Sequence, residues 1–412
     1  MHPKSLSDWL SYIESQHPNN IELGLDRCSA VLAKLDYSRP KEKIFTISGT
    51  NGKGSTCAFL THFLGLKSRS VGTFTSPHFV HFNERIAING KPVSDEIICQ
   101  AFEHIEDIRG DIELTYFEFN TLAAIHIFSA AKLDYWVLEV GLGGRLDSVN
   151  MIDTDIAAVT SISLDHIDWL GDSLEVIAQE KAGIARAGKL LISGVNQPPS
   201  SLQTTALKLG AIFKQKGEDY HFTVESDNTW SWQGNGQLIT DLIIPSLPLE
   251  NAATVLALLS YAGFELDQKT LNNLMQNTRL TGRFQTLMST PDVILDVAHN
   301  PEAALELQRR LISSNRKILA VCGMLHDKDI EAVLTCLKSD FEYWYLADLP
   351  APRGASSTQL AQYINDNYQQ FDSVANAFDA AIVQAQKEDA LVVVFGSFVT
   401  VADTITHHQN HY

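Results

Sequence analysis

The residues best suited to chemistry lie in the stretch KIFTISGTNGKGST at 43–56, between a β-branched apolar run and an amphipathic segment. Its glycines let backbone N–H groups turn toward an anion at the start of a helix, where the helix dipole adds positive charge. The lysine supplies a full positive charge. The arrangement predicts a site for nucleotide phosphates, with Lys53 also catalytic, built from Gly49, Thr50, Asn51, Gly52, Lys53, Gly54 and Ser55.

The spacing of this loop departs from the common phosphate loop, which has four residues between its first glycine and the Gly-Lys pair. Here only Thr50 and Asn51 intervene, and Gly54 separates the lysine from the hydroxyl of Ser55. An ordinary glycine-rich turn is the alternative. A strand before the loop, a helix after it and a lysine within it favour phosphate binding.

Two polar clusters follow apolar strands further along the chain. Glu139 ends YWVLEV and precedes GLGGRLD, so its carboxylate is placed to hold Mg²⁺ beside a phosphate loop. A dinucleotide-binding turn is the competing interpretation, but its third glycine is replaced by Leu146. His166 lies in DHID after a second strand. Histidines in polar loops are commonly surface residues, and Mg²⁺ prefers oxygen, so His166 needs support from elsewhere.

Two more segments carry charged residues with a possible role. Glu180-Lys181 lies in a predicted helix, where it is either a solvated charged pair or a pair with a buried lysine. The cluster DVAHNP at 296–301 ends another apolar strand, and its proline suits the first position of a helix. A cluster at a strand end usually faces a ligand. Arg283, just before it, could reach phosphates from a second domain.

Strand, glycine-containing loop and helix alternate along most of the chain, which predicts a mostly parallel sheet with helices on both faces. The first series comprises strands at 43–48, 135–140, 156–162 and 189–193, and helices at 53–66 and 173–185. Short alternating strands at 217–245 predict an antiparallel hairpin, followed by helices at 251–262 and 268–276. The second series comprises strands at 293–297, 318–322, 343–347 and 391–395, and helices at 303–311 and 330–337.

A chain of 412 residues is longer than one core usually grows. We therefore expect an α/β protein with two domains and a linker near 285–291. The first, 1–287, is a P-loop parallel-sheet ATPase domain with a small antiparallel insertion. The second, 288–412, is a smaller Rossmann-like α/β domain.

Composition narrows the class of protein. The net charge of −18 opposes binding to nucleic acid or an anionic membrane, so an anionic ligand needs a locally positive pocket or metal ions. No apolar run is long enough to cross a bilayer, and the first 16 residues lack the pattern of a signal or transit peptide. The five cysteines include no CxxC pair, which argues against a disulfide framework or a thiolate zinc site. A cytoplasmic enzyme is the expectation.

Seven motifs occur together in an order that resembles the Mur-ligase-like amide ligases, and within them the dihydrofolate synthase/folylpolyglutamate synthase branch. They are GTNGKGS at 49–55, TSPH at 75–78, EVGLGGRLD at 139–147, SLDHIDWLG at 163–171, EKAGI at 180–184, GRF at 282–284 and DVAHNP at 296–301. They span most of the chain. The unusual phosphate-loop spacing is this branch's own version.

The resemblance implies an amide ligase with small-molecule substrates: ATP, L-glutamate, dihydropteroate and reduced folates. ATP would phosphorylate the carboxylate of a pteroate or folate, and the amino group of glutamate would then displace phosphate from the acyl phosphate. Phosphorylation is needed because an unmodified carboxylate has no adequate leaving group, whereas phosphate leaves readily once its charge is neutralised. A monomer is the expected state.

The resemblance makes 1–287 the domain that binds ATP and pteroate and 288–412 the glutamate-ligase domain, and it also assigns site residues. Ser76 and Glu139 match ligands of one Mg²⁺, and His166 matches a ligand of a second, catalytically important Mg²⁺. Lys181 matches a catalytic lysine that is carbamylated, which turns a cation into a carboxylate-like group. The nucleotide positions are Asn251, on the adenine side, with Arg283 and Asp296, and the glutamate positions between the domains are His299 and Ser397.

The acceptor pocket is implied by IELGLDR at 21–27, TYFE at 115–118 and Asp147, with Leu23, Gly24, Thr115, Phe117 and Asp147 as the pteroate-binding residues. Phe117 can stack on a pterin ring, or simply pack in the core, and Asp147 can pair with the amino and ring nitrogens. These segments favour a bifunctional enzyme. The alternatives are a monofunctional folylpolyglutamate synthase, a P-loop ATPase switch without ligase activity, and a peptidoglycan-building Mur ligase. The last is disfavoured because the segment before Gly49 is too short for a separate uridine-nucleotide domain.

Overall fold

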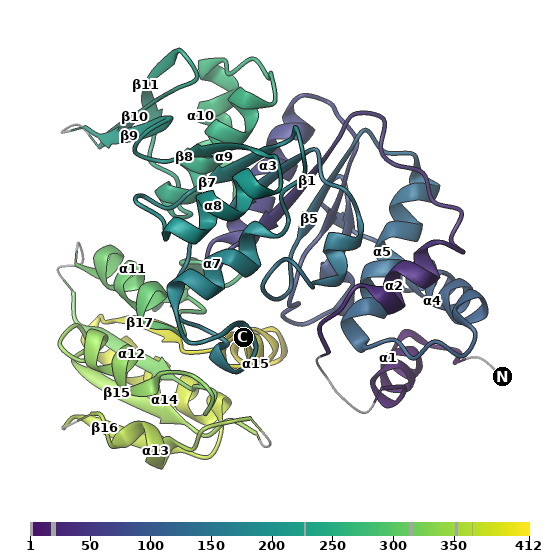
Figure 1. The fold of residues 1–412 in the computed structure, drawn as a ribbon. Coiled ribbons are helices and arrows are strands. Elements are labelled where there is room, and N and C mark those ends of the chain that lie inside the picture. Colours follow the sequence, from purple (N-terminus) through teal and green to yellow (C-terminus); the bar gives the residue numbers. More distant parts are fainter. Residues whose placement is uncertain (1–2, 18–21, 226–227, 313–315, 351–352, 365) are drawn as a thin grey trace. The chain divides into compact units, whose positions relative to one another are not determined.

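The structure is a computed structural model that describes residues 3–17, 22–225, 228–312, 316–350, 353–364 and 366–412 (Figure 1). It divides into two compact units, Met1–Thr278 and Arg279–Tyr412. The segment expected to be a linker is instead strand β12 (Gln285–Ser289), paired antiparallel with β13 (Asp292–Leu295) in the second unit. None of its residues is fully buried, so its composition is that of a connection.

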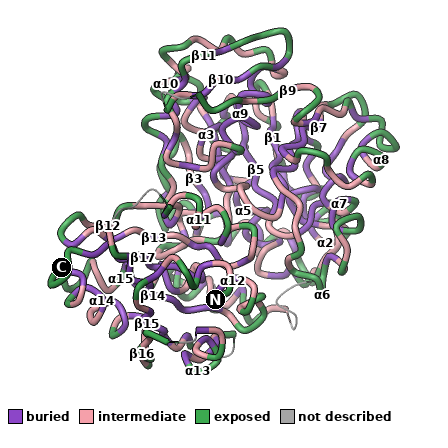
Figure 2. Tube along the Cα trace, turned by 90° about the vertical axis from the view of Figure 1, so that its left-hand side faces the viewer, coloured by how far each residue is buried: buried purple, intermediate pink, exposed green. Residues whose placement is uncertain are grey.

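The first unit is built on an eight-stranded sheet with the order β4-β3-β2-β5-β1-β6-β7-β8. Its strands are β1 (Lys43–Ser48), β2 (Val71–Phe74), β3 (Ile86–Ile88), β4 (Lys91–Pro92), β5 (Tyr135–Glu139), β6 (Ile156–Val159), β7 (Leu190–Ser193) and β8 (Ile212–Gln215). The six neighbouring strands β2, β5, β1, β6, β7 and β8 pair in parallel. β3 and β4 extend the sheet beyond β2 as an antiparallel edge. β1 and β5, in the middle, are almost wholly buried (Figure 2), as expected for parallel strands covered on both faces.

The helices of this unit pack on the sheet, on one another or on the small antiparallel sheet. They are α1 (Leu6–Ser15), α2 (Asp26–Leu32), α3 (Lys53–Leu66), α4 (Asp95–Arg109), α5 (Tyr116–Ala131), α6 (Ile167–Leu170), α7 (Leu174–Ala182), α8 (Ser200–Lys208), α9 (Leu249–Tyr261) and α10 (Gln268–Asn277). Two 3₁₀ turns, η1 (Phe82–Arg85) and η2 (Ser148–Met151), precede β3 and β6. α3, which starts at the end of β1, packs against both β5 and α9.

A three-stranded antiparallel sheet, ordered β11-β10-β9, forms the predicted insertion. Its strands are β9 (Tyr220–Val224), β10 (Thr229–Gly234) and β11 (Gln237–Ile243). The buried indoles of β10 fix it in place, because Trp230 Nε1 donates to Ile243 O at 3.0 Å and Trp232 Nε1 donates to Ala253 O of α9 at 3.1 Å.

The second unit is a six-stranded sheet with the order β12-β13-β17-β14-β15-β16, parallel except for the β12–β13 edge. The remaining strands are β14 (Ile318–Cys322), β15 (Tyr343–Ala347), β16 (Tyr368–Phe371) and β17 (Leu391–Phe395). The helices are α11 (Pro301–Leu311), α12 (Ile330–Leu337), α13 (Ser357–Ala361), α14 (Val374–Glu388) and α15 (Phe398–His411). The predicted α/β class with a separate smaller domain is confirmed. Among the described helices, none has the length and apolarity needed to cross a membrane.

Candidate active site

The phosphate loop lies where β1 ends and α3 begins. Gly52, with φ of 85°, is the N-cap of α3 and offers no side chain to satisfy the first N–H groups of the helix, which are therefore suited to an anion. Hydrogen bonds hold the loop to Ser161, just after β6: Thr50 N donates to Ser161 O and Asn51 N donates to the side-chain Ser161 Oγ, both at 2.9 Å. Lys53 Nζ donates back to Gly49 O at 3.0 Å and Thr50 O at 3.2 Å.

Two loop glycines are required by their protein neighbours. A Cβ at position 49 would overlap Thr160 Oγ1, and a Cβ at position 52 would overlap the side-chain amide of Asn251. Asn251 lies in the first turn of α9 and is buried. The structure thus brings the predicted nucleotide residue Asn251 against the phosphate loop itself.

We expect Gly52→Ala to weaken ATP binding by at least about tenfold, because the new methyl group must displace Asn251 and the residue keeps a left-handed backbone. Equilibrium binding of ATP would measure it. Gly188→Ala is the matched control, since Gly188 also has positive φ, 70°, but nothing lies within 4 Å of its Cβ position. The control should lose some thermal stability and keep ATP affinity; equal affinity losses in both variants would contradict the prediction.

The donor atoms beside the loop fit a magnesium ion. The Ser55 hydroxyl is 1% exposed and hydrogen-bonds to no described residue. Glu139 ends β5, is 4% exposed and accepts from Ser76 N at 3.2 Å. No three His, Cys, Asp or Glu side chains converge as a metal cluster within the described residues. Mg²⁺ suits such a site, because it is usually bound by one or two carboxylates, with waters and substrate phosphates completing its shell.

The second predicted metal ligand, His166, lies on the loop after β6. It has φ of 52° and is the N-cap of the short helix α6. Its side chain is 38% exposed, and its backbone N–H donates to Asp165 Oδ1 at 2.9 Å. The imidazole is therefore accessible to a ligand, as either a surface residue or a metal ligand requires.

Lys181 lies in the last turn of α7 and is 2% exposed, so it is not part of a solvated pair. Its neighbour Glu180 pairs instead with Arg145, whose Nη2 lies 2.8 Å from Glu180 Oε1. The backbone of the loop after β5 packs against the same turn, because a Cβ at Gly144 would lie 2.7 Å from Glu180 O. The lysine and the loop that follows Glu139 are thus in direct contact.

The three segments implied for pteroate binding are tied together. Gly24 N donates to Leu146 O at 3.1 Å, and Arg27 Nη2 lies 3.2 Å from Glu118 Oε1. Thr115 begins α5 in a capping box with Glu118. Leu23 lies in the same segment, half-buried, whereas Ile21 falls outside the described residues.

Phe117 and Asp147 both organise the turn after β5. The Phe117 ring is half-buried and lies over Gly141, where a Cβ would be 2.5 Å from its Cζ. Asp147 Oδ2 accepts from Leu142 N at 2.8 Å and its Oδ1 from Val149 N at 2.9 Å. Burial raises the pKa of Asp147 to about 6, although these bonds and Lys53 oppose the rise. Its proton is therefore held more tightly in the fold than in the unfolded chain, and the stability it contributes falls as pH rises toward 6.

In the second unit, the predicted residues gather at the carboxyl ends of β13 and β17. Asp296 accepts from Phe284 N and Ala298 N, both at 2.9 Å, and burial raises its pKa while Arg283 opposes the rise. The Arg283 guanidinium lies over the Phe398 ring at 5.1 Å, and the His299 ring is 6.2 Å from the same ring. Ser397 is buried and caps α15 by accepting from Thr400 N at 3.0 Å.

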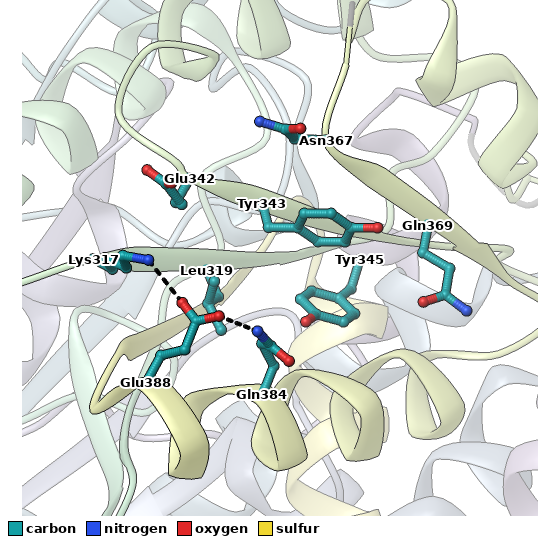
Figure 3. A pocket seen from close by; sticks show the side chains of 9 residues that line it. All are labelled: Lys317, Leu319, Glu342, Tyr343, Tyr345, Asn367, Gln369, Gln384 and Glu388. Atoms are coloured by element: carbon teal, nitrogen blue, oxygen red, sulfur yellow. Dashed lines mark hydrogen bonds and ion pairs between the residues drawn. The ribbon is translucent and has the colours of Figure 1, made fainter.

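A pocket of about 380 Å³ lies elsewhere in the second unit, at the amino ends of β14 and β15 and beside the end of α14 (Figure 3). Tyr343 and Tyr345 line it, and Lys317, Glu388 and Gln384 form a hydrogen-bonded row along one wall. It contains none of the residues predicted for the site.

In the first unit, Arg85 is a buried residue that no sequence motif marks. It ends η1, nine residues after the predicted ligand Ser76, and its carbonyl accepts from Thr75 N at 2.9 Å. The only sequence signal is an arginine between an aromatic residue and an apolar strand, in HFNERIAI. That pattern is equally typical of a surface arginine.

Comparison with known proteins matches both units. Residues 47–197 match the Mur ligase middle domain, and residues 282–398 match the Mur ligase glutamate ligase domain. A dihydrofolate synthase/folylpolyglutamate synthase of Escherichia coli (strain K12) is 45% identical over 399 residues, covering 96% of this chain and 94% of its own length.

Two solved structures are similar over nearly the whole chain. The structure of E. coli FolC in complex with DHPP and ADP superposes with a TM-score of 0.95 at 44% identity, covering 99% of this chain and 98% of that one. The second is a bifunctional folylpolyglutamate synthase/dihydrofolate synthase with Mn, AMPPNP and L-glutamate bound. It gives a TM-score of 0.93 at 44% identity, covering 99% of this chain and 100% of that one.

Proposed function

The chain belongs to the Mur ligase family, in the dihydrofolate synthase/folylpolyglutamate synthase branch of ATP-dependent ligases, and on that basis we propose that it joins L-glutamate to two kinds of acceptor. The first is dihydropteroate, which gives dihydrofolate. The second is reduced folate of the tetrahydrofolate type, which gains further glutamates. Relatives with bound ADP, AMPPNP, manganese and L-glutamate support ATP, a divalent metal ion and glutamate as ligands.

One observation carries the proposal: a phosphate loop, a carboxylate and the acceptor segments are joined around the ends of neighbouring strands. Gly49–Ser55 follows β1, and Glu139 ends the adjacent β5. Phe117 lies directly over Gly141, two residues beyond Glu139. A phosphate donor and a carboxylate acceptor bound here would meet, which is what carboxylate activation requires.

In the first step, a carboxylate oxygen of the acceptor forms a bond to the γ-phosphorus as the bond from that phosphorus to the ADP oxygen breaks. The N–H groups at the start of α3 and the ammonium group of Lys53 hold the phosphates and offset their negative charge. The side chain of Asn251 lies against the loop at Gly52. We propose that Arg283 and Asp296 contact the nucleotide from the second unit.

Ser55, Ser76 and Glu139 would hold one Mg²⁺, and His166 would contribute to a second. When bound, these ions would neutralise charge on the phosphates and the leaving group. We propose that Lys181 is carbamylated, which would place a carboxylate-like group beside the loop that follows Glu139. Its burial supports this, because a buried position protects a carbamate and removes the lysine from bulk water.

In the second step, the amino nitrogen of glutamate forms a bond to the acyl carbon and loses a proton, while the carbon–oxygen bond to phosphate breaks. We propose that His299 binds glutamate and that Ser397 supports it by holding the start of α15. We also propose that the protein is a monomer, which light scattering would test.

The test is a substrate series with purified protein, ATP and Mg²⁺. Phosphate release and amide formation should depend on glutamate together with dihydropteroate or tetrahydrofolate, and each acceptor should inhibit use of the other. Activity with tetrahydrofolate alone would reduce the proposal to a monofunctional folylpolyglutamate synthase. ATP hydrolysis that needs neither acceptor nor glutamate would replace it with a P-loop ATPase, and no turnover with any combination would refute it.

A further inference from the structure

Arg85 is a buried cation enclosed by aromatic rings. It is 9% exposed, and its guanidinium carbon lies 5.8 Å from the centre of the Phe82 ring and 5.7 Å from that of Tyr116. Its Nε donates to His78 Nδ1 at 2.8 Å. An imidazole that accepts a hydrogen bond carries no negative charge, so His78 does not offset the charge of the guanidinium.

No carboxylate of the described chain pairs with Arg85, and its two terminal nitrogens have no hydrogen-bond partner there. Glu84 and Glu139 are close enough to interact with its charge, but both have hydrogen-bond partners of their own. Glu84 accepts from Phe79 N at 2.8 Å and Val80 N at 2.9 Å, and Glu139 accepts from Ser76 N at 3.2 Å. A guanidinium is charged at all physiological pH values, and a buried charge is costly unless it is paired. The site is thus built to receive an anion.

The position of Arg85 indicates which anion. Its carbonyl holds Thr75 at the end of β2, next to Ser76, and its guanidinium touches Tyr116, next to Phe117. It therefore lies where the metal residues and the acceptor residues meet. The group of the acceptor that must reach the metal end is its carboxylate.

We propose that Arg85 binds the carboxylate that becomes phosphorylated, through paired hydrogen bonds from its two terminal nitrogens. The inference rests on the proposed function and deepens it by assigning a carboxylate subsite. Planar guanidinium matches carboxylate in a two-point contact that lysine cannot reproduce. The same positive charge reduces the repulsion between the carboxylate and the γ-phosphate as the two approach.

The test compares dihydropteroate with the same molecule carrying hydrogen in place of its carboxylate, by calorimetry in the presence of ADP and Mg²⁺. The wild-type protein should bind the carboxylate form about 10- to 100-fold more tightly. Arg85→Gln should bind both ligands with the affinity that the wild type has for the uncharged one. Arg85→Lys should keep part of the preference, which covers the case in which the glutamine variant does not fold. Arg69→Gln, an exposed arginine in the same unit, should behave as the wild type.

A merely structural Arg85 would weaken both ligands equally and leave their ratio unchanged, which would overturn the inference. A rise in KM for glutamate with an unchanged ratio would assign the anion to glutamate instead and would also overturn it. Failure of the wild type to bind dihydropteroate would refute the proposed function, a result distinct from either of these.

Discussion

Lys53→Ala is expected to abolish turnover, with kcat lowered by at least about 10³-fold, while the fold remains intact. The lysine is the only full positive charge within Gly49–Ser55. Its Nζ contacts the Gly49 and Thr50 carbonyls, so in the folded chain it lies over the loop that would hold phosphates. Alanine is a strong helix former and suits the first position of α3. Phosphate release under saturating substrates measures the loss.

Lys67→Ala is the matched control for this variant. Lys67 follows the other end of α3, where it pairs with Asp267 at 2.7 Å. Its removal should reduce stability slightly and leave kcat close to the wild-type value. Near-UV and far-UV circular dichroism would show that both variants are folded. A Lys53→Ala enzyme with wild-type kcat would remove the phosphate loop from the mechanism.

Lys181→Ala is expected to lower kcat by about 10²- to 10³-fold, and short carboxylic acids such as acetate should restore part of it. Truncation removes both the amine and any carbamate from a buried position. A small carboxylate can occupy the vacated space and replace the carbamate charge. Lys181→Arg should be as impaired as the alanine variant, because it keeps the positive charge but does not form a carbamate.

Lys189→Ala serves as the control for the rescue. Lys189 is an exposed lysine that pairs with Asp155 at 2.9 Å, so its loss should change neither kcat nor the response to acetate. Activity should be measured over a range of acetate concentrations, with chloride as the matching salt. An unimpaired Lys181→Ala enzyme would leave Lys181 a structural residue and end the carbamylation proposal.

The sequence predicts the strands of the fold well where burial is complete. β1, β14, β15 and β17 begin and end at the expected residues, because short runs of apolar residues, mostly β-branched or aromatic, suit buried parallel strands. It does not predict α5, whose residues are buried on nearly every side and therefore show no amphipathic stripe. It places a linker over β12, because a partly buried edge strand has the composition of a connection.

The site is predictable where a motif carries its own mechanism and unpredictable where tertiary contacts decide. The phosphate loop needs only its glycines, lysine and flanking elements. The burial of Lys181 depends on the turn after β5, which packs against α7. The burial of Arg85 depends on rings from η1 and α5, far apart in the chain. No local pattern distinguishes either residue from a solvated cation.

The contact between Phe117 and Gly141 limits how acceptor preference can be changed. The Phe117 ring rests on Gly141, two residues after Glu139 at the end of β5. A larger residue at 141, or a differently shaped ring at 117, would therefore shift the Glu139 carboxylate as well. Engineering this chain for other acceptors should therefore start from Leu23, on the segment that Gly24 ties to the turn through its hydrogen bond to Leu146 O. The Leu23 side chain is only half-buried, and its replacement does not require the ring at 117 or the glycine at 141 to change.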